Sequence, residues 1–298
     1  MSKYIYLVNR FNLREKTDEI IQKLRKASKE LGRDYKIIVN GSPQEADAAV
    51  SGLKSSEYVV TVIGGDGSIN LLLNNLAGTQ TTMAFIPIGT GNDFYRGCLE
   101  NLEDGIHDVD LIRINDRYFI NVACFGIDAD IANDDNFIHN RFIPRPLRYH
   151  AGVAWHFLTF RHGRRMKIEF ESEEGNSWRK SAQGVFTTVV AANNRYYGGG
   201  YKVSPESRID DGLMEVFMVG QIGRVKVARI LLSMKSGRHL KHPALHIART
   251  RHLRITADQP ICANIDGEPL LSDHFDLMLL PKACRIEMDR EFIEKVRI

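Results

Sequence analysis

The first 120 residues alternate short apolar runs with longer stretches whose apolar residues recur every three or four positions. Val59–Ile63 is a nearly unbroken apolar run, which predicts a buried strand of a parallel sheet. Lys16–Leu31 carries apolar residues at helical spacing and is followed by Gly32, which predicts a helix that ends there. The alternation predicts a doubly wound α/β domain. Its strands are expected at 4–8, 35–39, 59–63 and 83–86, and its helices at 16–31, 44–53 and 68–76.

The pattern changes near Asp110, where short runs typical of strands begin to dominate. Two strands are expected on either side of an Asn115-Asp116 turn, and many more follow with turn residues between them. Such a series predicts a β-sandwich as a second domain. Its strands are expected at 166–172, 177–183, 185–192, 213–219, 253–257, 261–265, 275–280 and 284–288, and its helices at 146–160 and 225–236. The expected domains are therefore 1–120 and 121–288.

The composition is that of an ordinary soluble globular protein, with 43% hydrophobic and 26% charged residues among 298. No run approaches the roughly 20 apolar residues that a membrane-spanning helix needs. The four cysteines are far apart and form no C-x-x-C pair. This spacing argues against zinc and against a disulfide framework, and it favours a reducing cytosol.

The distribution of charge along the chain is more informative than the net charge, which is only +3. Arg141–Lys167 holds seven Lys or Arg residues and no acid, and Val216–Ala257 holds nine and again no acid. A basic surface of this kind attracts phosphates, anionic lipid or nucleic acid. Nucleic acid is disfavoured because the basic segments carry no recognisable motif for binding it.

Two glycine-rich turns carry the candidate chemistry. The first, Gly64–Ser68, follows a buried strand, contains Asp66 and precedes a predicted helix. The second, Gly89–Asp93, follows the next predicted strand and again ends in a carboxylate. Both turns should emerge at the same carboxyl edge of the sheet, where open α/β sheets bind ligands. Glycine turns that lead into helices predict a phosphate site with a metal-binding or polarising acid, although tight turns that only pack helices onto a sheet give similar spacing.

Four motifs in this order resemble the diacylglycerol kinase catalytic-domain family, which includes sphingosine and ceramide kinases, and its bacterial soluble lipid kinases in particular. The motifs are Gly64-Gly65-Asp66-Gly67-Ser68, Gly89-Thr90-Gly91-Asn92-Asp93-Phe94, Ser204-Pro205 with Asp211-Gly212-Leu213, and Asp266-Gly267-Glu268. The first strand departs from the family, because Asn9 is followed by neither Pro nor Gly. The loop after Asn9 is therefore expected to be shaped differently.

The resemblance implies an ATP-dependent kinase that transfers the γ-phosphate to a lipid hydroxyl, with diacylglycerol or a related lipid as acceptor. It implies an N-terminal nucleotide-binding domain, a C-terminal β-sandwich domain for the lipid, and an active site in the interdomain cleft. It also implies that the tail 289–298 returns to the first domain. Peripheral contact with anionic lipid at the inner membrane surface is expected for a cytoplasmic enzyme of this kind, and the oligomeric state is left open, a homodimer included.

Residue roles also follow from the resemblance, with ATP and Mg²⁺ as the implied nucleotide and metal. Asp66 and Asp93 would act at the phosphates with Mg²⁺, and Glu268 would be the general base with Asp266 as a supporting acid. Asp211 would bind a second, structural Mg²⁺ together with the backbone carbonyls of Arg208 and Leu213. The implied nucleotide-binding residues are Asn40, Gly64, Gly65, Asp66, Gly67, Ser68, Asn70, Gly89, Thr90 and Asn92.

Several alternatives stay open at this point. An NAD kinase-like small-molecule kinase would share the first glycine turn, and a non-catalytic nucleotide-binding module would keep the fold without turnover. Asp266-Gly267-Glu268 also fits a plain solvent-exposed hairpin turn, and Asp211-Gly212 fits a plain turn before a strand. The aromatic loop Tyr196–Tyr201 either lines a lipid pocket or merely turns a corner.

Overall fold

The chain forms two compact units, and the long strand β15 belongs to both of them. The computed structural model describes residues 3–88, 91–133, 163–171 and 178–297. Unit 1 is Met1–Leu111, Ile209–Asp211 and Leu280–Ile298, and unit 2 is Ile112–Arg208 and Gly212–Leu279. Unit 1 thus includes residues 209–211 and 280–288, which the predicted bounds place in the second domain. The predicted helix at 146–160 lies outside the described residues.

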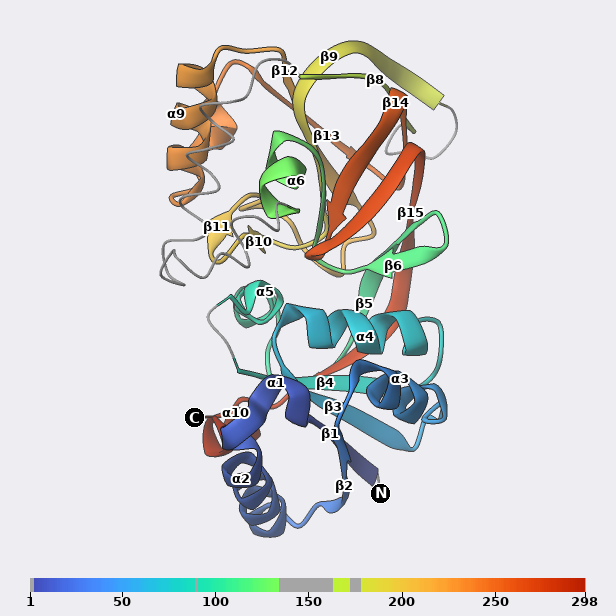
Figure 1. Ribbon diagram of the computed structural model, residues 1–298, viewed down its shortest axis with the longest axis vertical. Coiled ribbons are helices and arrows are strands. Elements are labelled where there is room, and N and C mark those ends of the chain that lie inside the picture. Colours follow the sequence, from blue (N-terminus) through green and yellow to red (C-terminus); the bar gives the residue numbers. More distant parts are fainter. Residues whose placement is uncertain (1–2, 89–90, 134–162, 172–177, 298) are drawn as a thin grey trace. The chain divides into compact units, whose positions relative to one another are not determined.

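Unit 1 is built on a parallel sheet with the strand order β15–β4–β3–β1–β2 (Figure 1). The near-continuous apolar runs explain its centre, because every residue of β4 and all but the first of β3 are buried. Its strands are β1 (Lys3–Asn9), β2 (Asp34–Asn40), β3 (Tyr58–Gly64), β4 (Thr82–Pro87) and the last part of β15 (Glu268–Met288); β5 (Gly105–Ile114) leads from unit 1 into unit 2.

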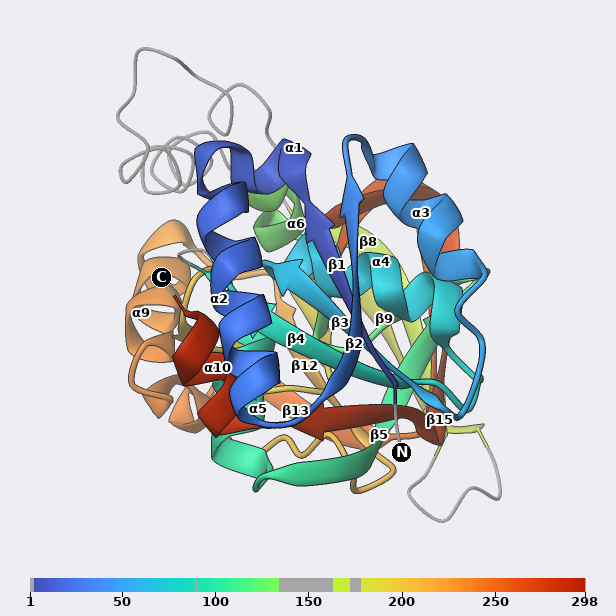
Figure 2. The same cartoon turned by 90° about the horizontal axis from the view of Figure 1, so that it is seen from below.

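Helices cover both faces of this sheet. Helices α2 and α10 lie side by side on one face, and α3 and α4 pack together on the other (Figures 1 and 2). The C-terminal helix α10 is held by the Arg33 guanidinium, which lies 4.1 Å from the ring centre of Tyr4 and 3.9 Å from that of Phe292. The helices are α1 (Arg10–Leu13), the 3₁₀ turn η1 (Arg14–Lys16), α2 (Thr17–Glu30), α3 (Pro43–Ser51), α4 (Asp66–Leu76), α5 (Asp93–Asn101) and α10 (Arg290–Val296).

Unit 2 is an antiparallel β structure in which long strands pair with several neighbours. Strand β9 pairs with β8, β7 and β12, and β14 pairs with β8, β7 and β15. Its strands are β6 (Arg117–Phe119), β7 (Val122–Gly126), β8 (Arg164–Glu171), β9 (Trp178–Ala192), β10 (Tyr196–Tyr197), β11 (Tyr201–Lys202), β12 (Met214–Gly220), β13 (Leu245–Thr250) and β14 (His252–Ile265). Its helices are α6 (Ile127–Ala132), α9 (Arg224–Met234) and the 3₁₀ turn η2 (Arg238–Lys241).

Three pairs of predicted strands each form a single long strand in the structure, namely β9, β14 and β15. Gly184 lies inside β9, and β14 continues through a register shift between Thr256 and Ile261. Strand β15 passes through Pro281 and ends only at Met288. Glycine, proline and polar clusters suggest strand ends in the sequence, but β9 stays paired with β8 through Gly184, and β14 resumes its pairing with β15 after the shift. The short helix α6 is absent from the predicted elements.

The core of unit 2 includes a large cluster of buried side chains from its strands, and a second, smaller cluster lies beside α6. Phe125 and Phe275 meet edge to face at its centre, with ring centres 4.9 Å apart. The alternating burial of β8 and β15 follows the alternation of apolar and polar residues along each strand. The predicted fold class, a doubly wound α/β domain followed by a β-sandwich domain, is confirmed. No helix of the described part is long and apolar enough to cross a membrane.

Candidate functional site

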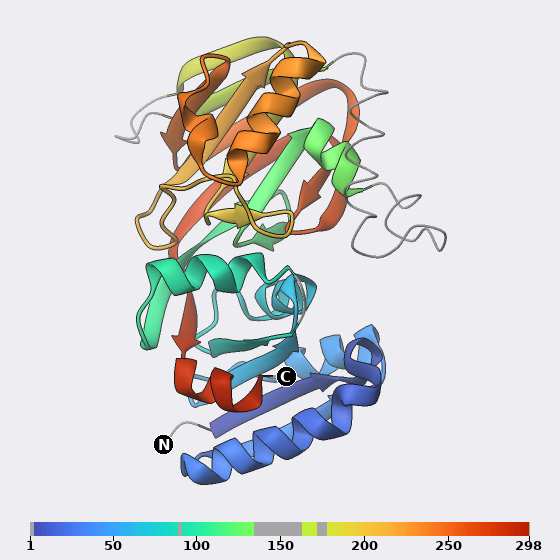
Figure 3. The same ribbon diagram turned by 90° about the vertical axis from the view of Figure 1, so that its left-hand side faces the viewer.

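The carboxyl ends of four parallel strands meet at one edge of the unit 1 sheet (Figure 3). β1 ends at Asn9, β2 at Asn40, β3 at Gly64 and β4 at Pro87. Ligands of open α/β sheets bind outside this edge, because the loops and helix N-termini that follow the strands gather there. The predicted nucleotide-binding residues that the structure describes all belong to or follow these strand ends.

The glycines of the first turn have different roles. A Cβ at Gly64 would lie 2.2 Å from Ser68 Oγ, so a side chain there would displace the buried Ser68. Gly65 is the N-cap of α4 and offers no side-chain cap. Gly67 is exposed and has open space where a Cβ would stand. The N–H groups of a first helical turn beside open space form the arrangement that binds phosphate oxygens.

Asp66 joins this turn to the second glycine turn. Its Oδ2 accepts a hydrogen bond from the Asp93 N–H and its Oδ1 accepts one from the Phe94 N–H, both at 3.2 Å. These N–H groups lie at the start of α5, where the helix dipole favours negative charge. Helix α4 begins at Asp66 itself, two residues before the predicted start at Ser68. The structure therefore brings together the two turns that carry the predicted acids Asp66 and Asp93.

The second turn ends in a left-handed residue. Asn92, the N-cap of α5, has φ 49° and ψ 44°, a conformation that Asn tolerates better than most residues. Asp93 follows and is only 5% exposed. A Cβ at Gly91 would lie 3.4 Å from Asp66 Oδ2, so the two turns are closely packed. The predicted nucleotide-binding residues Gly89 and Thr90 lie outside the described residues.

Two further predicted ligand residues lie at the same edge. Asn40 and Asn9 face each other across β1 and β2, and Asn40 Nδ2 donates a hydrogen bond of 3.1 Å to Asn9 Oδ1. Both side chains are buried. Asn70 lies one turn into α4, and its Oδ1 accepts a hydrogen bond of 3.0 Å from Asn74 Nδ2. Nucleotide contacts of Asn40, Ser68 and Asn70 stay predictions.

Glu268 lies in unit 2, at the start of β15. It pairs with Ile265 across a two-residue hairpin in which Asp266 and Gly267 both have positive φ, 47° and 93°. The Asp266 carboxylate accepts hydrogen bonds from three successive backbone N–H groups, those of residues 120–122, at 2.8–3.1 Å. Asp266, expected as a supporting acid, thus anchors the hairpin, and Glu268 is exposed.

The predicted second metal site lies in the turn before β12. Asp211 and Leu213 are half-buried and Arg208 is exposed. The Ser207 hydroxyl is hydrogen-bonded to the buried carboxylate of Glu215, which fixes part of this turn to β12. Among the described residues no group of three or more His, Cys, Asp or Glu side chains could hold a metal ion. The predicted set would use one carboxylate and two backbone carbonyls, and its metal role stays a prediction.

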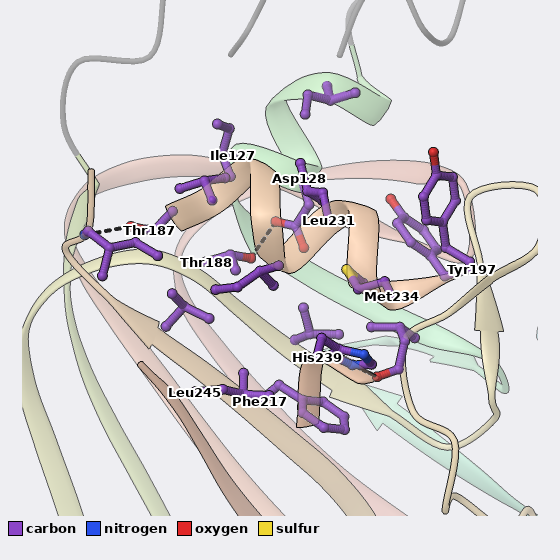
Figure 4. Close-up of a pocket in the computed structure, with 18 residues that line it drawn as sticks. Ile127, Asp128, Thr187, Thr188, Tyr197, Phe217, Leu231, Met234, His239 and Leu245 are labelled. Atoms are coloured by element: carbon purple, nitrogen blue, oxygen red, sulfur yellow. Dashed lines mark hydrogen bonds between the residues drawn. The ribbon is translucent and has the colours of Figure 1, made fainter. Parts of the chain in front are cut away.

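Unit 2 also contains an apolar pocket that no sequence motif marks (Figure 4). It lies between the helices α6 and α9 and the strands β9, β12 and β13, with a cavity volume of about 80 Å³. Leu231 and Met234 of α9 point into the same space as Phe217 of β12 and Leu245 of β13. A pocket of this kind suits an apolar ligand that needs few polar contacts for orientation.

The polar groups of the pocket are few. Asp128 Oδ1 accepts a hydrogen bond of 2.5 Å from the Thr188 hydroxyl. Burial raises the pKa of the Asp128 carboxyl above its usual value, and the hydrogen bond from Thr188 opposes this rise. His239 Nε2 donates a hydrogen bond of 2.8 Å to the Val203 carbonyl, and burial lowers the pKa of this imidazole. The pocket therefore offers a carboxyl, a hydroxyl and an imidazole within a mainly apolar wall.

The pocket residues were missed because they are scattered along the chain. Val227, Ile230, Leu231 and Met234 recur at helical spacing in the sequence, which predicts a buried helix face but not a cavity beside it. Asp128 lies on α6, a helix of only six residues. The aromatic loop Tyr196–Tyr201 was a signal in the sequence, because Tyr197 and Tyr201 line this pocket, and its contact with a lipid stays a prediction.

Family models match both parts of the chain. Residues 3–118 match the diacylglycerol kinase catalytic domain, and residues 121–288 match the YegS C-terminal NAD kinase beta sandwich-like domain. The chain belongs to this family of lipid kinases, which confirms the predicted resemblance. It is thus an ATP-dependent phosphotransferase with an alcohol group as acceptor, as predicted.

Individual relatives agree with this assignment. A protein of Shewanella frigidimarina named "Probable lipid kinase YegS-like" is 28% identical over 243 residues, which are 76% of this chain and 75% of the relative. A protein of the same name from Enterobacter sp. is 29% identical over 252 residues, 78% of this chain and 79% of the relative. The solved structure of a diacylglycerol kinase from Bacillus anthracis str. Sterne has the same fold, with a TM-score of 0.70, 18% identity and 98% of each chain covered.

Proposed function

We propose that this kinase transfers the γ-phosphate of ATP to the hydroxyl group of diacylglycerol or a closely related lipid. The apolar pocket of unit 2 is the observation that carries the proposal. A small polar alcohol would gain nothing from walls such as Val190, Phe217 and Ile230, whereas an acyl chain would bury its surface against them at about 0.8 kcal/mol per CH₂ group. The pair of Asp128 and Thr188 would accept a hydrogen bond from a polar group of the same lipid, or donate one to it.

The phosphates of ATP would bind at the carboxyl edge of unit 1. The N–H groups at the start of α4 would face the phosphate oxygens, and the open space at Gly67 would let the backbone approach them. Asn40, Ser68, Asn70 and Asn92 would add polar contacts. Gly89 and Thr90 would also contact the nucleotide at this edge, as the motif predicts.

The residues at this edge fit a magnesium ion that accompanies ATP. Asp66 Oδ1 and Oδ2 accept one hydrogen bond each at 3.2 Å, and a carboxylate has about four lone-pair sites, so Asp66 retains acceptors for a hydrated ion. Mg²⁺ is commonly held by one or two carboxylates with several waters, which suits Asp66 and Asp93. When bound, the ion would neutralise charge that develops on the transferred phosphoryl group.

Two further roles complete the proposal. Glu268, on its anchored hairpin, would accept the proton of the lipid hydroxyl as that oxygen attacks phosphorus. Asp211, with the carbonyls of Arg208 and Leu213, would hold a second, structural Mg²⁺. The enzyme would act in the cytoplasm at the inner membrane surface, where its lipid acceptor lies.

An assay with purified protein, labelled ATP and Mg²⁺ tests the proposal against a panel of acceptors in mixed micelles. The panel holds diacylglycerol, monoacylglycerol, sphingosine and ceramide, with NAD as a water-soluble alcohol. Phosphorylation of one lipid and not of NAD is expected. Transfer to NAD alone would instead favour an NAD kinase-like enzyme, and transfer to nothing would favour a nucleotide-binding module.

A pocket-filling variant links the activity to unit 2. Leu231→Trp should narrow the pocket and raise the KM for a long-chain lipid by roughly tenfold or more, because two or more buried CH₂ groups are lost at about 0.8 kcal/mol each. The KM for ATP should change little. Leu271→Trp is the matched control, since Leu271 is 70% exposed on β15 and outside the pocket. Equal lipid KM values in both variants would place the acceptor elsewhere.

A further inference from the structure

Helix α9 has two apolar faces, and the described residues of unit 2 cover only one of them. Val227, Ile230, Leu231 and Met234 form the inner face and line the pocket (Figure 4). The opposite side of the helix carries Val225 and Leu232, which are 64% and 77% exposed. They are two of the three most exposed large apolar side chains in the described part of the chain, so this face is unusual for this protein.

The outer face combines these apolar residues with cations. Val225, Arg229 and Leu232 follow one another at spacings of four and three residues, so they lie on one stripe of the helix. Lys226 lies to one side of the stripe and Lys235 to the other, and all five side chains are exposed. We define these five residues as the α9 outer face. Apolar groups flanked by long basic side chains are typical of helices that lie in the interface of an anionic membrane.

The charge around the helix selects among candidate partners. Val216–Ala257, which includes α9, η2 and β13, contains nine Lys or Arg residues and no Asp or Glu. A second copy that packed against α9 through the same segment would therefore bring further cations and no Asp or Glu from that segment. A bilayer with anionic headgroups offers negative charge to the Lys and Arg side chains. It also offers an apolar phase in which Val225 and Leu232 can be buried.

We propose that the α9 outer face docks on the surface of an anionic lipid bilayer. The inference rests on the proposed function, because a lipid acceptor has to leave a bilayer to enter the pocket. A helix with its side chains is roughly 10 Å thick, so docking through the outer face puts the pocket about one helix diameter from the lipid. α9 is then both the membrane contact and the wall of the acceptor pocket.

Sedimentation with vesicles tests the docking directly, without any turnover. The wild-type chain is mixed with phosphatidylglycerol vesicles or with phosphatidylcholine vesicles, at low salt and at physiological salt. Binding should be at least tenfold stronger to phosphatidylglycerol, and it should weaken with salt because exposed charges are screened over about 8 Å at physiological ionic strength. Equal binding to both lipids, or to neither, would overturn the proposal.

Variants then locate the docking on α9. The pair Lys226→Glu and Arg229→Glu should lower the partition onto phosphatidylglycerol vesicles by roughly tenfold or more, given the worth of each basic residue near an anionic surface. Val225→Ser with Leu232→Ser should lower it by a smaller factor at every salt concentration. Lys26→Glu, on the exposed side of α2, is the charge control, and Leu271→Ser is the apolar control. If the control variants lose as much vesicle binding as the α9 variants do, the assignment of docking to α9 is overturned.

A soluble substrate separates this proposal from the kinase function. A short-chain lipid alcohol below its critical micelle concentration reaches the pocket without a membrane, so the α9 variants should phosphorylate it at the wild-type rate and fail only with vesicle-borne acceptor. If the α9 variants phosphorylate both the soluble and the vesicle-borne acceptor at the wild-type rate, docking through α9 is overturned and the kinase function stands. Vesicle binding without phosphorylation of any lipid would keep the docking and overturn the kinase function. Sedimentation velocity is run in parallel, and a dimer that the α9 variants break in the absence of vesicles would assign this face to a second copy.

Discussion

The carboxyl edge of the unit 1 sheet and the apolar pocket of unit 2 are built in different ways. The carboxyl edge consists of backbone groups and short polar side chains that follow directly after strands, so each turn is continuous in sequence. The pocket consists of side chains from α6, β9, β12, α9, η2 and β13, which are far apart along the chain. A site that uses backbone N–H groups needs a local motif, whereas a site that uses apolar walls needs only shape, and many sequences provide the same shape.

The largest expected effect concerns Glu268, which belongs to a local motif but lies in unit 2. Glu268→Gln keeps the size of the side chain and removes the basic carboxylate. It should lower kcat by roughly 10²–10⁴-fold, the usual worth of a positioned base, and leave the KM for ATP within a few fold. Steady-state kinetics on the best lipid acceptor measure both values.

The hairpin itself supplies the control for Glu268. Asp266→Asn leaves an acceptor oxygen but weakens three hydrogen bonds to backbone N–H groups, so its main effect should be on the midpoint of thermal unfolding. If Glu268→Gln retains most of its kcat, the motif is only a hairpin turn, and the base of the reaction lies elsewhere in the chain.

A variant of Asp66 tests the proposed phosphate role of the carboxyl edge of unit 1. Asp66→Ala should lower kcat by a factor that corresponds to about 3 kcal/mol of the barrier, because a charge placed at the phosphates is lost. It should also cost roughly 1 kcal/mol of stability, because its carboxylate caps the N-terminus of α5. Asp34→Ala, an exposed carboxylate at the amino end of the same sheet, should change neither. A normal kcat in Asp66→Ala would leave Asp66 as a structural cap alone.

Much of the fold could be predicted from sequence, but mainly where local patterns decide it. The apolar runs at β3 and β4 identify buried parallel strands, and the glycine turns identify the sheet edge where Asp66 and Asp93 meet. The long strands β14 and β15 were divided in the prediction, because residues such as Pro281 suggest a break that only pairing with neighbouring strands removes. Helix α6 escaped prediction because six residues are too few for a helical pattern.

The residues of the candidate site also divide into those that a local motif identifies and those whose role depends on contacts between distant segments. The role of Asp66 as a link to α5 depends on two loops that are separated by 27 residues, so no single motif contains it. Asp266 has the same character, since its carboxylate binds backbone N–H groups some 145 residues away. Asp128 and His239 carry no motif, and only the packing of α6 and η2 beside the strands brings them into one pocket.

A pair of glycine variants separates packing from ligand approach within one turn. Gly64→Ala should cost about 1–3 kcal/mol of stability, because its Cβ would stand 2.2 Å from Ser68 Oγ and the buried Ser68 has to move. Gly67→Ala should instead stabilise the fold by about 0.4–1 kcal/mol, since its position is helical and open. Urea unfolding measures both values. Binding of ATP should nevertheless weaken in Gly67→Ala, and unchanged ATP affinity there would remove the phosphate role of this glycine.

The smallest expected effect tests a third kind of construction, a cluster in unit 1 that is assembled from distant residues. The Tyr4 hydroxyl donates a hydrogen bond of 3.1 Å to Glu287 Oε1, beside Arg33. Burial and the charge of Glu287 raise the pKa of Tyr4 to about 12, from an ordinary value of about 10. A raised pKa means that the folded state holds the phenolic proton more tightly than the unfolded state does. The contribution of Tyr4 to stability is therefore complete below pH 10 and is lost as the pH rises through 12.

Tyr4→Phe removes this proton and with it the pH dependence. The variant should be slightly less stable than the wild type at pH 7, because the hydrogen bond to Glu287 is gone. Between pH 10 and pH 12 the free energy of unfolding should fall more steeply for the wild type, so that the two curves converge. Urea unfolding at intervals across this window measures the slopes. Parallel curves would show that the hydroxyl of Tyr4 is no more strongly protonated in the fold than in the unfolded chain, and the distant contact with Glu287 would then contribute little to holding β15 and β1 together.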